Sequence, residues 1–221
     1  MVFCEKVGRL KGAGISGMVQ TTKKCANREP SSRAMTKGEF ETLLHEAGKL
    51  ARDRDFILSG SQALRGVCAT FPRDFPKTTA ANLIPRHQPE ALATLRAELG
   101  KESKFFKQYG CYLDSPDPAI MVLPNAWEKR LIPFRTPRTG GVTAWCLDPT
   151  DLFVCKLFVW ETEDQQFARA MLKHKIATPK AVLNRIENMP ILPLRQKKLR
   201  RLVEELVACC RTEWARFGRL P

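Results

Sequence analysis

Apolar residues recur at helical spacing between residues 37 and 52, which is the clearest periodic signal in the first third of the chain. One face of such a helix carries Phe40, Leu43, Leu44, Ala47, Leu50 and Ala51. The sequence Thr36-Lys37-Gly38-Glu39 just before them has the Thr-x-x-Glu form of a capping box. The pattern therefore predicts an amphipathic helix over 37–52.

Short apolar runs separated by turn residues follow this helix. The run 55–59 ends at Gly60-Ser61, which predicts a strand, a tight turn and a short helix over 61–66. A second strand is expected over 78–84, because Pro85 stops it. A helix opened by Pro89 and closed by Gly100 comes next. Further strands are expected over 105–113, 119–123, 131–135 and 142–147, the last two around a hairpin or loop at Thr139-Gly140-Gly141.

From Asp148 onward the pattern is helical. Asp148-Pro149 supplies an N-cap and a proline at the first helical position. Further helices are expected over 163–174, over 179–187 and after Pro193, the last with a basic outer face. We therefore expect an α/β (α+β) fold, in which a mixed twisted sheet has flanking helices and a C-terminal helical part. The expected division is a mobile basic extension over 1–34, a core over 35–147 and a helical region over 148–221.

The composition is that of an ordinary globular protein, with 43% apolar and 27% charged residues in 221. No apolar run approaches the roughly 18 residues of a membrane span, and no secretory signal is evident, so we expect a cytoplasmic protein. Eight scattered cysteines without a Cys-x-x-Cys pair, together with three histidines, favour reduced thiols over a zinc site.

The net charge of +14 is concentrated at the two ends of the chain. Residues 1–38 hold eight lysines and arginines against two acidic residues, and residues 167–221 hold thirteen against four. Such basic ends indicate a polyanion, either nucleotide or nucleic acid, or an acidic protein as partner. Solubility with a flexible basic tail is the alternative interpretation.

Several stretches converge on one resemblance, which runs from about residue 35 to about residue 190. They are 56–64 with its Gly60-Ser61, 123–131 (LPNAWEKRL), 141–147 (GVTAWCL) and 148–152 (DPTDL) followed by Lys156-Leu157. Together they resemble a bacterial family of small proteins in the minimal nucleotidyltransferase superfamily, related to the enzymatic partners in some toxin–antitoxin and phage-defence loci. The resemblance implies a nucleotidyltransferase-like fold and a protein partner from an adjacent gene.

In that superfamily the Gly-Ser turn holds a nucleoside triphosphate, and two carboxylates on the next strand bind Mg²⁺. By resemblance, Gly60, Ser61 and Gln62 would contact the nucleotide. The two positions that should carry the carboxylates are Ala80 and Asn82, and neither supplies the anionic oxygen that a hard cation needs. We therefore expect no bound metal and a degenerate site.

The resemblance also implies roles for residues on the helices after the sheet. Lys156 would contact phosphate, and Asp151 or Asp164 would orient it. Alternatively Asp151 caps its helix and Lys156 pairs with it or with a neighbour. Asp148 is a further supporting acid. Among the histidines, His45 and His174 are expected on the surface, whereas His87 follows the altered strand and is a candidate for lining the cleft.

These observations leave three functions open. The first is a nucleotidyltransferase-like pseudoenzyme that binds a nucleotide, nucleic acid or protein partner with little or no transfer. The second is an active enzyme that moves NMP from an NTP to RNA or protein, with Mg²⁺ held by Asp148, Asp151 or another acid. The third is a non-enzymatic antitoxin or defence-system subunit that interacts through its basic C-terminal helix.

Overall fold

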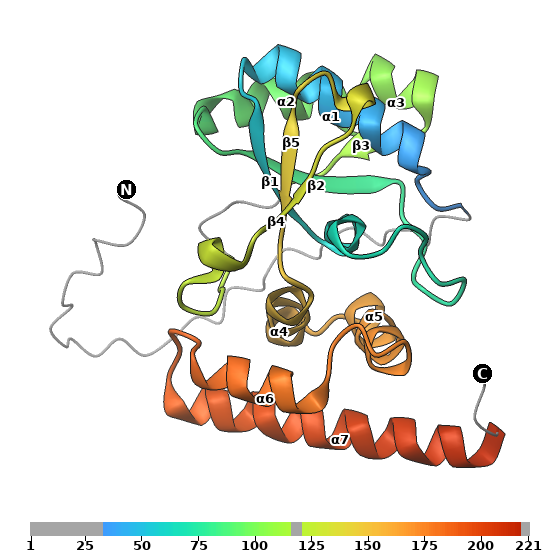
Figure 1. Cartoon of the computed structure of the whole chain (residues 1–221), viewed down its shortest axis with the longest axis vertical. Coiled ribbons are helices and arrows are strands. Elements are labelled where there is room, and N and C mark those ends of the chain that lie inside the picture. Colours follow the sequence, from blue (N-terminus) through green and yellow to red (C-terminus); the bar gives the residue numbers. More distant parts are fainter. Residues whose placement is uncertain (1–32, 116–120, 218–221) are drawn as a thin grey trace, which may run out of the picture.

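The fold is mixed α+β, as expected, and is built on one five-stranded sheet. The computed structural model describes residues 33–115 and 121–217 (Figure 1). The strands are β1 (Asp55–Ser59), β2 (Ala80–Pro85), β3 (Tyr112–Leu113), β4 (Ile132–Phe134) and β5 (Thr143–Cys146), in the order β3-β2-β1-β5-β4. β1 pairs antiparallel with β2 and parallel with β5, while β2–β3 is parallel and β4–β5 antiparallel.

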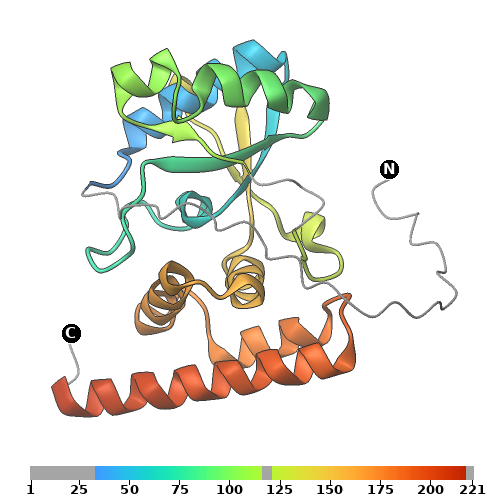
Figure 2. The same ribbon diagram turned by 180° about the vertical axis from the view of Figure 1, so that it is seen from behind.

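The helices form two groups, one toward each end of the central strands. They are α1 (Lys37–Ala51), α2 (Leu92–Leu99), α3 (Lys104–Tyr109), α4 (Pro149–Val159), α5 (Thr162–Lys173), α6 (Pro179–Glu187) and α7 (Pro193–Phe217), with short 3₁₀ turns η1 (Ser61–Gly66), η2 (Pro89–Ala91), η4 (Trp127–Arg130) and η5 (Pro137–Thr139). Helices α1 to α3 lie beyond one end of the sheet and α4 to α7 beyond the other, with η1 between the sheet and α4 (Figures 1 and 2).

The topology decides which side chains meet at each end of the sheet. Because β1 and β2 run in opposite directions, the end of β1 lies beside the start of β2, with Ser59 paired to Asn82. The parallel partner β5 ends at this same end of the sheet and leads directly into α4 (Figure 1). At the opposite end of these strands, Phe56 pairs with Pro85, so the start of β1 lies beside the end of β2.

Burial alternates along residues 55–58 of β1 and 144–146 of β5, as period-two side-chain placement requires. Phe56, Leu58, Ala144 and Cys146 are fully buried. Ile57 and Trp145, which point to the other face of the sheet, are only partly buried. The helical part continues the same core, and its members include Leu152, Phe153, Phe167, Met171, Val182, Ile186 and Val203. One face of the sheet is thus fixed by packing, while the other keeps partial contact with solvent.

The capping signals in the sequence mark the helix starts correctly. Thr36 and Glu39 form the predicted capping box of α1. Asp148 accepts the N–H groups of Thr150 and Asp151 at the start of α4. Thr178 accepts the Ala181 N–H at the start of α6, whose bounds match the prediction. Side-chain acceptors satisfy N–H groups that the first turn cannot pair, so they fix where a helix begins.

Two predicted strands are wrong or only partly described. Residues 104–109 form helix α3, and only Tyr112–Leu113 is a strand. Ser103 caps α3 through the Phe106 N–H, and Gly110 ends it with φ +65°, so local capping prevails over the aromatic β-propensity of this stretch. In the predicted strand 119–123, residues 119 and 120 lie outside the described residues and 121–123 are not a strand.

The predicted extension 1–34 lies outside the described residues, apart from Arg33 and Ala34. Met35, where the core is expected to begin, is 3% exposed, and its N–H donates to the Thr78 carbonyl oxygen. Trp127 begins η4 and packs against the core from there. Within the described ranges, no helix is both long enough and apolar enough to cross a membrane.

Candidate functional site

The Gly60-Ser61 turn leads from β1 into η1, at the edge of the sheet that faces α4 (Figure 1). Gly60 has φ +68° and ψ −171°, a conformation that is essentially restricted to glycine. A Cβ atom placed on Gly60 would lie 2.6 Å from Asn82 Oδ1. The glycine is therefore required twice, by its backbone conformation and by the side chain of Asn82 that fills the adjacent space.

Ala80 and Asn82 occupy the start of β2 beside this turn. Residues two apart on a strand point to the same face of the sheet. Ala80 and Asn82 therefore share a face with Ser59, the partner of Asn82. Ala80 is 6% exposed and pairs with Tyr112 of β3, whereas Asn82 is partly exposed. Positions 80 and 82 of β2 have the spacing that would place two carboxylates on one face. They carry a methyl group and a neutral amide instead.

Gln62, expected to contact the nucleotide, is 2% exposed and engaged within the fold. Its Oε1 accepts a 2.7 Å hydrogen bond from Arg65 Nε. Arg65 also donates to the Met35 carbonyl oxygen, and its guanidinium lies 5.3 Å from the centre of the Phe40 ring and 4.9 Å from that of Phe71. Desolvation by burial lowers the pKa of Arg65. The side chain of Gln62 thus supports η1 through Arg65.

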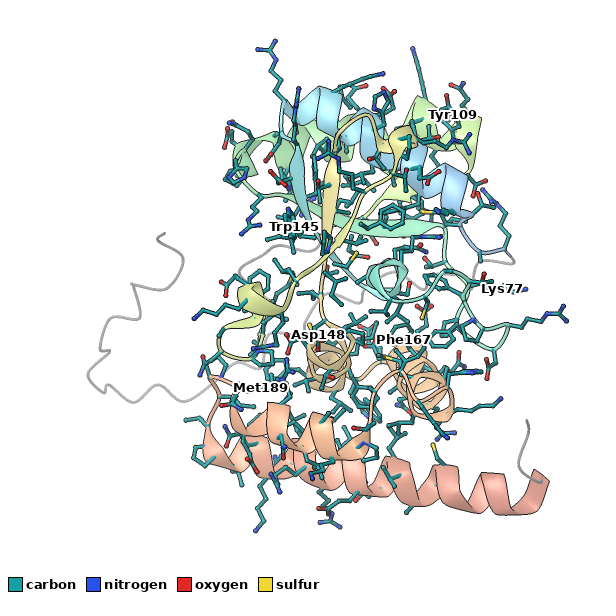
Figure 3. The ribbon with its side chains drawn as sticks, viewed as in Figure 1. Lys77, Tyr109, Trp145, Asp148, Phe167 and Met189 are labelled. Atoms are coloured by element: carbon teal, nitrogen blue, oxygen red, sulfur yellow. The ribbon has the colours of Figure 1, made fainter. Side chains whose placement is uncertain are left out.

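Asp148 and Asp151 begin α4 in different roles (Asp148 is labelled in Figure 3). Asp148 Oδ1 caps the helix and lies 3.6 Å from Arg185 Nη1. Asp151 is fully buried and accepts hydrogen bonds from Arg130 at 2.8 and 3.1 Å and from Arg185. Asp151 therefore joins η4, α4 and α6 in a buried ion cluster and does not orient Lys156.

Lys156 and Asp164 are the pair that the structure does bring together. Lys156 Nζ bonds Asp164 Oδ1 and lies 5.1 Å from the centre of the Phe167 ring. Asp164 Oδ2 also accepts the Glu161 N–H in the capping box of α5. Both side chains are largely buried. The contact between Lys156 and Asp164 fits both interpretations of Lys156, because Asp164 is also one of the acids that the resemblance names as orienting it.

The residues around the turn do not fit the Mg²⁺ ion that the resemblance implies. Mg²⁺ requires anionic oxygen donors in octahedral geometry, and Ala80 and Asn82 supply one neutral oxygen between them. β5 carries Thr143-Ala144-Trp145-Cys146, which contains no acidic residue. Asp148 and Asp151 both contact Arg185, so they do not form a free anionic pair for a metal. No catalytic step can be derived through Mg²⁺ at this edge.

The whole chain was compared with protein-family models, curated proteins and solved structures. None of these comparisons found a match. The chemistry of the site therefore rests on its own residues.

The thiols and histidines play no part at the turn. Cys68, Cys111, Cys146 and Cys155 are free thiols, while Cys4 and Cys25 lie outside the described residues. Desolvation by burial raises the pKa of Cys146, next to η1, to about 12, which makes it a poor nucleophile. His87 follows β2 at its far end and so does not line the turn.

The start of α7 carries the exposed basic residues expected there. Arg195, Lys197, Lys198 and Arg201 are exposed on this segment. Arg195 lies over the Phe158 ring at 4.7 Å, and Arg201 pairs with Glu205. In the described ranges, Lys197 and Lys198 take part in no ion pair. Among the described side chains of α7, these two lysines are therefore exposed and available to an anionic partner.

Sequence reasoning missed Arg65, Arg130 and Arg185. Arg65 follows the Gly60-Ser61 turn at a helical spacing, which was a usable signal for a residue supporting η1. Arg130 and Arg185 lie 21 and 34 residues from Asp151. Only the tertiary packing of η4 and α6 against α4 brings them together, so no local pattern could have found them.

Proposed function

We propose that the chain is a nucleotidyltransferase-like protein with a degenerate metal site, which binds a nucleotide, nucleic acid or protein partner with little or no transfer. The observation that supports it is the placement of Asn82. Its amide lies against Gly60 and its backbone pairs with Ser59, at the point where the superfamily requires a carboxylate. The geometry of a strand, a Gly-Ser turn and a facing strand is retained while its anionic donors are missing.

Nucleotide binding is tested by thermal unfolding of the full chain with ATP, GTP, CTP and UTP, with and without Mg²⁺. A ligand at one hundred times its Kd adds about 2.7 kcal/mol of stability. We expect a shift with at least one nucleotide, of equal size with and without Mg²⁺. A Ser61→Val variant, which removes the hydroxyl at the turn, should reduce that shift. No shift with any nucleotide would reject nucleotide binding and leave the protein-partner form of the proposal.

Transfer is tested with labelled NTPs and total tRNA as acceptor. The wild type should show no incorporation, because it lacks the oxygen donors for two metal ions. The double variant Ala80→Asp, Asn82→Asp restores both carboxylates, and aspartate is the smaller acid for the buried position 80. Incorporation by this variant alone would identify the lost carboxylates as the cause. Incorporation by the wild type would show an active enzyme and reject the proposal.

A second candidate function, binding of a polyanion by α7, is favoured by Lys197 and Lys198. Removing two phosphate contacts should reduce the slope of log affinity against log salt by about 1–2. We expect this reduction in a Lys197→Ala, Lys198→Ala variant bound to tRNA. The matched control is Lys101→Ala, Lys104→Ala, which removes the same charge from exposed positions near α3. Equal effects of the two variants would exclude α7 as the binding surface.

A further inference from the structure

One histidine and two aspartates converge at the edge of the sheet opposite to the Gly60 turn. Asp53 lies between α1 and β1, Asp55 is the first residue of β1, and His87 follows the end of β2. One ligand atom from each lies within 4.8 Å of the other two. The antiparallel pairing of Phe56 with Pro85 brings these three separate parts of the chain together.

The carboxylate of Asp53 is held in place by main-chain donors. It is 4% exposed. Its Oδ1 accepts the Asp55 N–H at 3.0 Å, and its Oδ2 accepts the N–H groups of His87 at 2.7 Å and Gln88 at 3.2 Å. In the ranges 33–115 and 121–217, no lysine or arginine forms an ion pair with Asp53. Its negative charge is thus fixed and buried without a cationic partner, while carboxylate oxygens retain further lone pairs.

Asp55 is oriented by Trp145, which is labelled within the sheet in Figure 3. Trp145 Nε1 donates to Asp55 Oδ1 at 2.7 Å. The other oxygen, Oδ2, faces His87 Nε2 at 3.6 Å. That distance is too long for a hydrogen bond. It is close to the separation of about 3.4 Å between two donors that share a tetrahedral Zn²⁺ at bond lengths of about 2.0–2.2 Å.

Arg86, the exposed residue before His87, forms no ion pair with Asp53 or Asp55 among the described residues. The Arg86 guanidinium lies 5.5 Å from the centre of the Trp145 ring, on the residue that donates to Asp55. A hydrogen-bond donor behind a carboxylate ligand is the usual outer support of a protein metal site. Trp145 and the main-chain donors to Asp53 supply such support here.

We propose that Asp53, Asp55 and His87 bind a divalent transition-metal ion, with Zn²⁺ as the ion that fits best. Two carboxylates balance its charge, and imidazole is a ligand that Zn²⁺ accepts and Mg²⁺ disfavours. The His87 side chain is 61% exposed and that of Asp55 33%, so the ion can enter and its remaining position can be taken by water. This site shares no residue with the Gly60 turn and does not depend on the proposed function.

The test is calorimetric titration of the metal-stripped full chain with ZnCl₂. We expect one site in the wild type whose affinity falls at least tenfold in His87→Ala and in Asp55→Asn. His174→Ala is the matched control, because it removes another imidazole at a distant position, and it should bind as the wild type does. Absence of binding, or equal binding by the wild type and His87→Ala, as thiol ligation would give, overturns the site.

Two further measurements separate a metal site from a surface ion pair. Zn²⁺ should raise the melting temperature of the wild type and of His174→Ala but not of His87→Ala, whereas Mg²⁺ at the same concentration should raise none. Trp145→Phe keeps all three ligands and removes the donor to Asp55, so Zn²⁺ affinity should fall by about 10–100-fold. Unchanged affinity in a folded Trp145→Phe protein would contradict the proposed support of Asp55.

Discussion

The two ends of β1 differ in the chemistry that they present. At the C-terminal end, the Gly60-Ser61 turn meets a methyl group at Ala80 and a neutral amide at Asn82. At the N-terminal end, Asp53 and Asp55 lie beside His87. Their carboxylate groups are held in place because they accept hydrogen bonds of 2.7–3.2 Å. The resemblance implies a site at the C-terminal end of β1, whereas the carboxylates that could bind a metal ion lie at its N-terminal end.

This difference shows that a backbone arrangement and its chemistry can be separated. The turn end keeps a glycine in a conformation that other residues disfavour, although Ala80 and Asn82 beside it carry no carboxylate. The opposite end has no motif in the sequence, yet strand pairing assembles three ligand-type side chains there. Function has to be argued from the side chains at each end and not from the strand–turn–helix arrangement alone.

The largest effect is expected below the turn end, where α4 supports η1. Asp151→Asn weakens the bonds to Arg130 and Arg185 and leaves these two partly buried guanidinium groups without the charge of their fully buried partner. Removing one partner of a buried ion pair costs about 3–5 kcal/mol. Urea unfolding should show a loss of that size. Glu187→Gln removes the exposed partner of Arg200 and should cost less than about 1 kcal/mol. Similar losses in both variants would contradict a buried anchor.

Gly60→Ala tests the backbone at the turn end directly. The strained conformation should cost about 1–3 kcal/mol, and contact with Asn82 Oδ1 should add to it. In an Asn82→Ala background the contact is removed, so the cost of Gly60→Ala should fall but not vanish. Gly38→Ala is the control, because Gly38 lies in α1 where an added Cβ would come no closer than 3.6 Å to Arg138 Nη1, and it should stabilise by about 0.5–1 kcal/mol. An additive double-mutant cycle would show that Asn82 does not fill the site.

Asp53→Ala tests the opposite end and should cost about 1–3 kcal/mol, because it leaves main-chain N–H groups without their acceptor. Asp55→Ala should cost less, since Asp55 is more exposed and accepts a bond from Trp145 alone among the described residues. The free energy of unfolding of metal-free protein in urea measures both. A larger loss of unfolding free energy in Asp55→Ala than in Asp53→Ala would contradict the inference that main-chain hydrogen bonds hold Asp53 in place.

The smallest effect concerns the loop between η1 and β2, where Asp74 bonds Lys173 at 2.8 Å and His174 at 2.6 Å. Desolvation by burial acts to raise the pKa of Asp74, but hydrogen bonds from Lys173 and His174 outweigh it and the pKa is lowered. The stabilisation is therefore present above the unfolded pKa near 3.8 and is lost as pH falls below it.

Asp74→Asn should remove that acid dependence and cost less than about 1 kcal/mol at neutral pH, because the pair is exposed. The measurement is the melting temperature of both proteins between pH 2 and pH 7. The two curves should converge at the acidic end. A constant difference across the whole range would show that Asp74 does not contribute through its charge.

Elements with local signals could be predicted from the sequence. Thr36, Asp148 and Thr178 mark helix starts because their side chains accept N–H groups a few residues ahead. The strand predicted over 105–113 is wrong for its first half, although Ser103 and Gly110 carry the signal for a short helix, because that prediction rests on the aromatic residues between them. Capping residues are in this case better evidence than side-chain propensity.

The residues that meet across the fold could not be predicted. Asp53 and His87 are 34 residues apart, and their contact follows from the register that pairs Phe56 with Pro85. The apolar runs favour two strands here but do not specify that register. Likewise, Asp151 could be placed in the first turn of α4, but not against Arg130 and Arg185. Ala80 and Asn82 were assigned to the turn end only through the resemblance, and the register that pairs Ser59 with Asn82 could not be read from the apolar runs either.

The contact between Asn82 and Gly60 also bears on how this site can evolve. Asparagine and aspartate have nearly the same shape, so the Asn82→Asp exchange would fit the space beside Gly60, and one base change in the codon makes it. Every alanine codon is also one base away from a codon for aspartate or for glutamate. The strands are already in register, so two point mutations separate the present chain from one that carries both carboxylates.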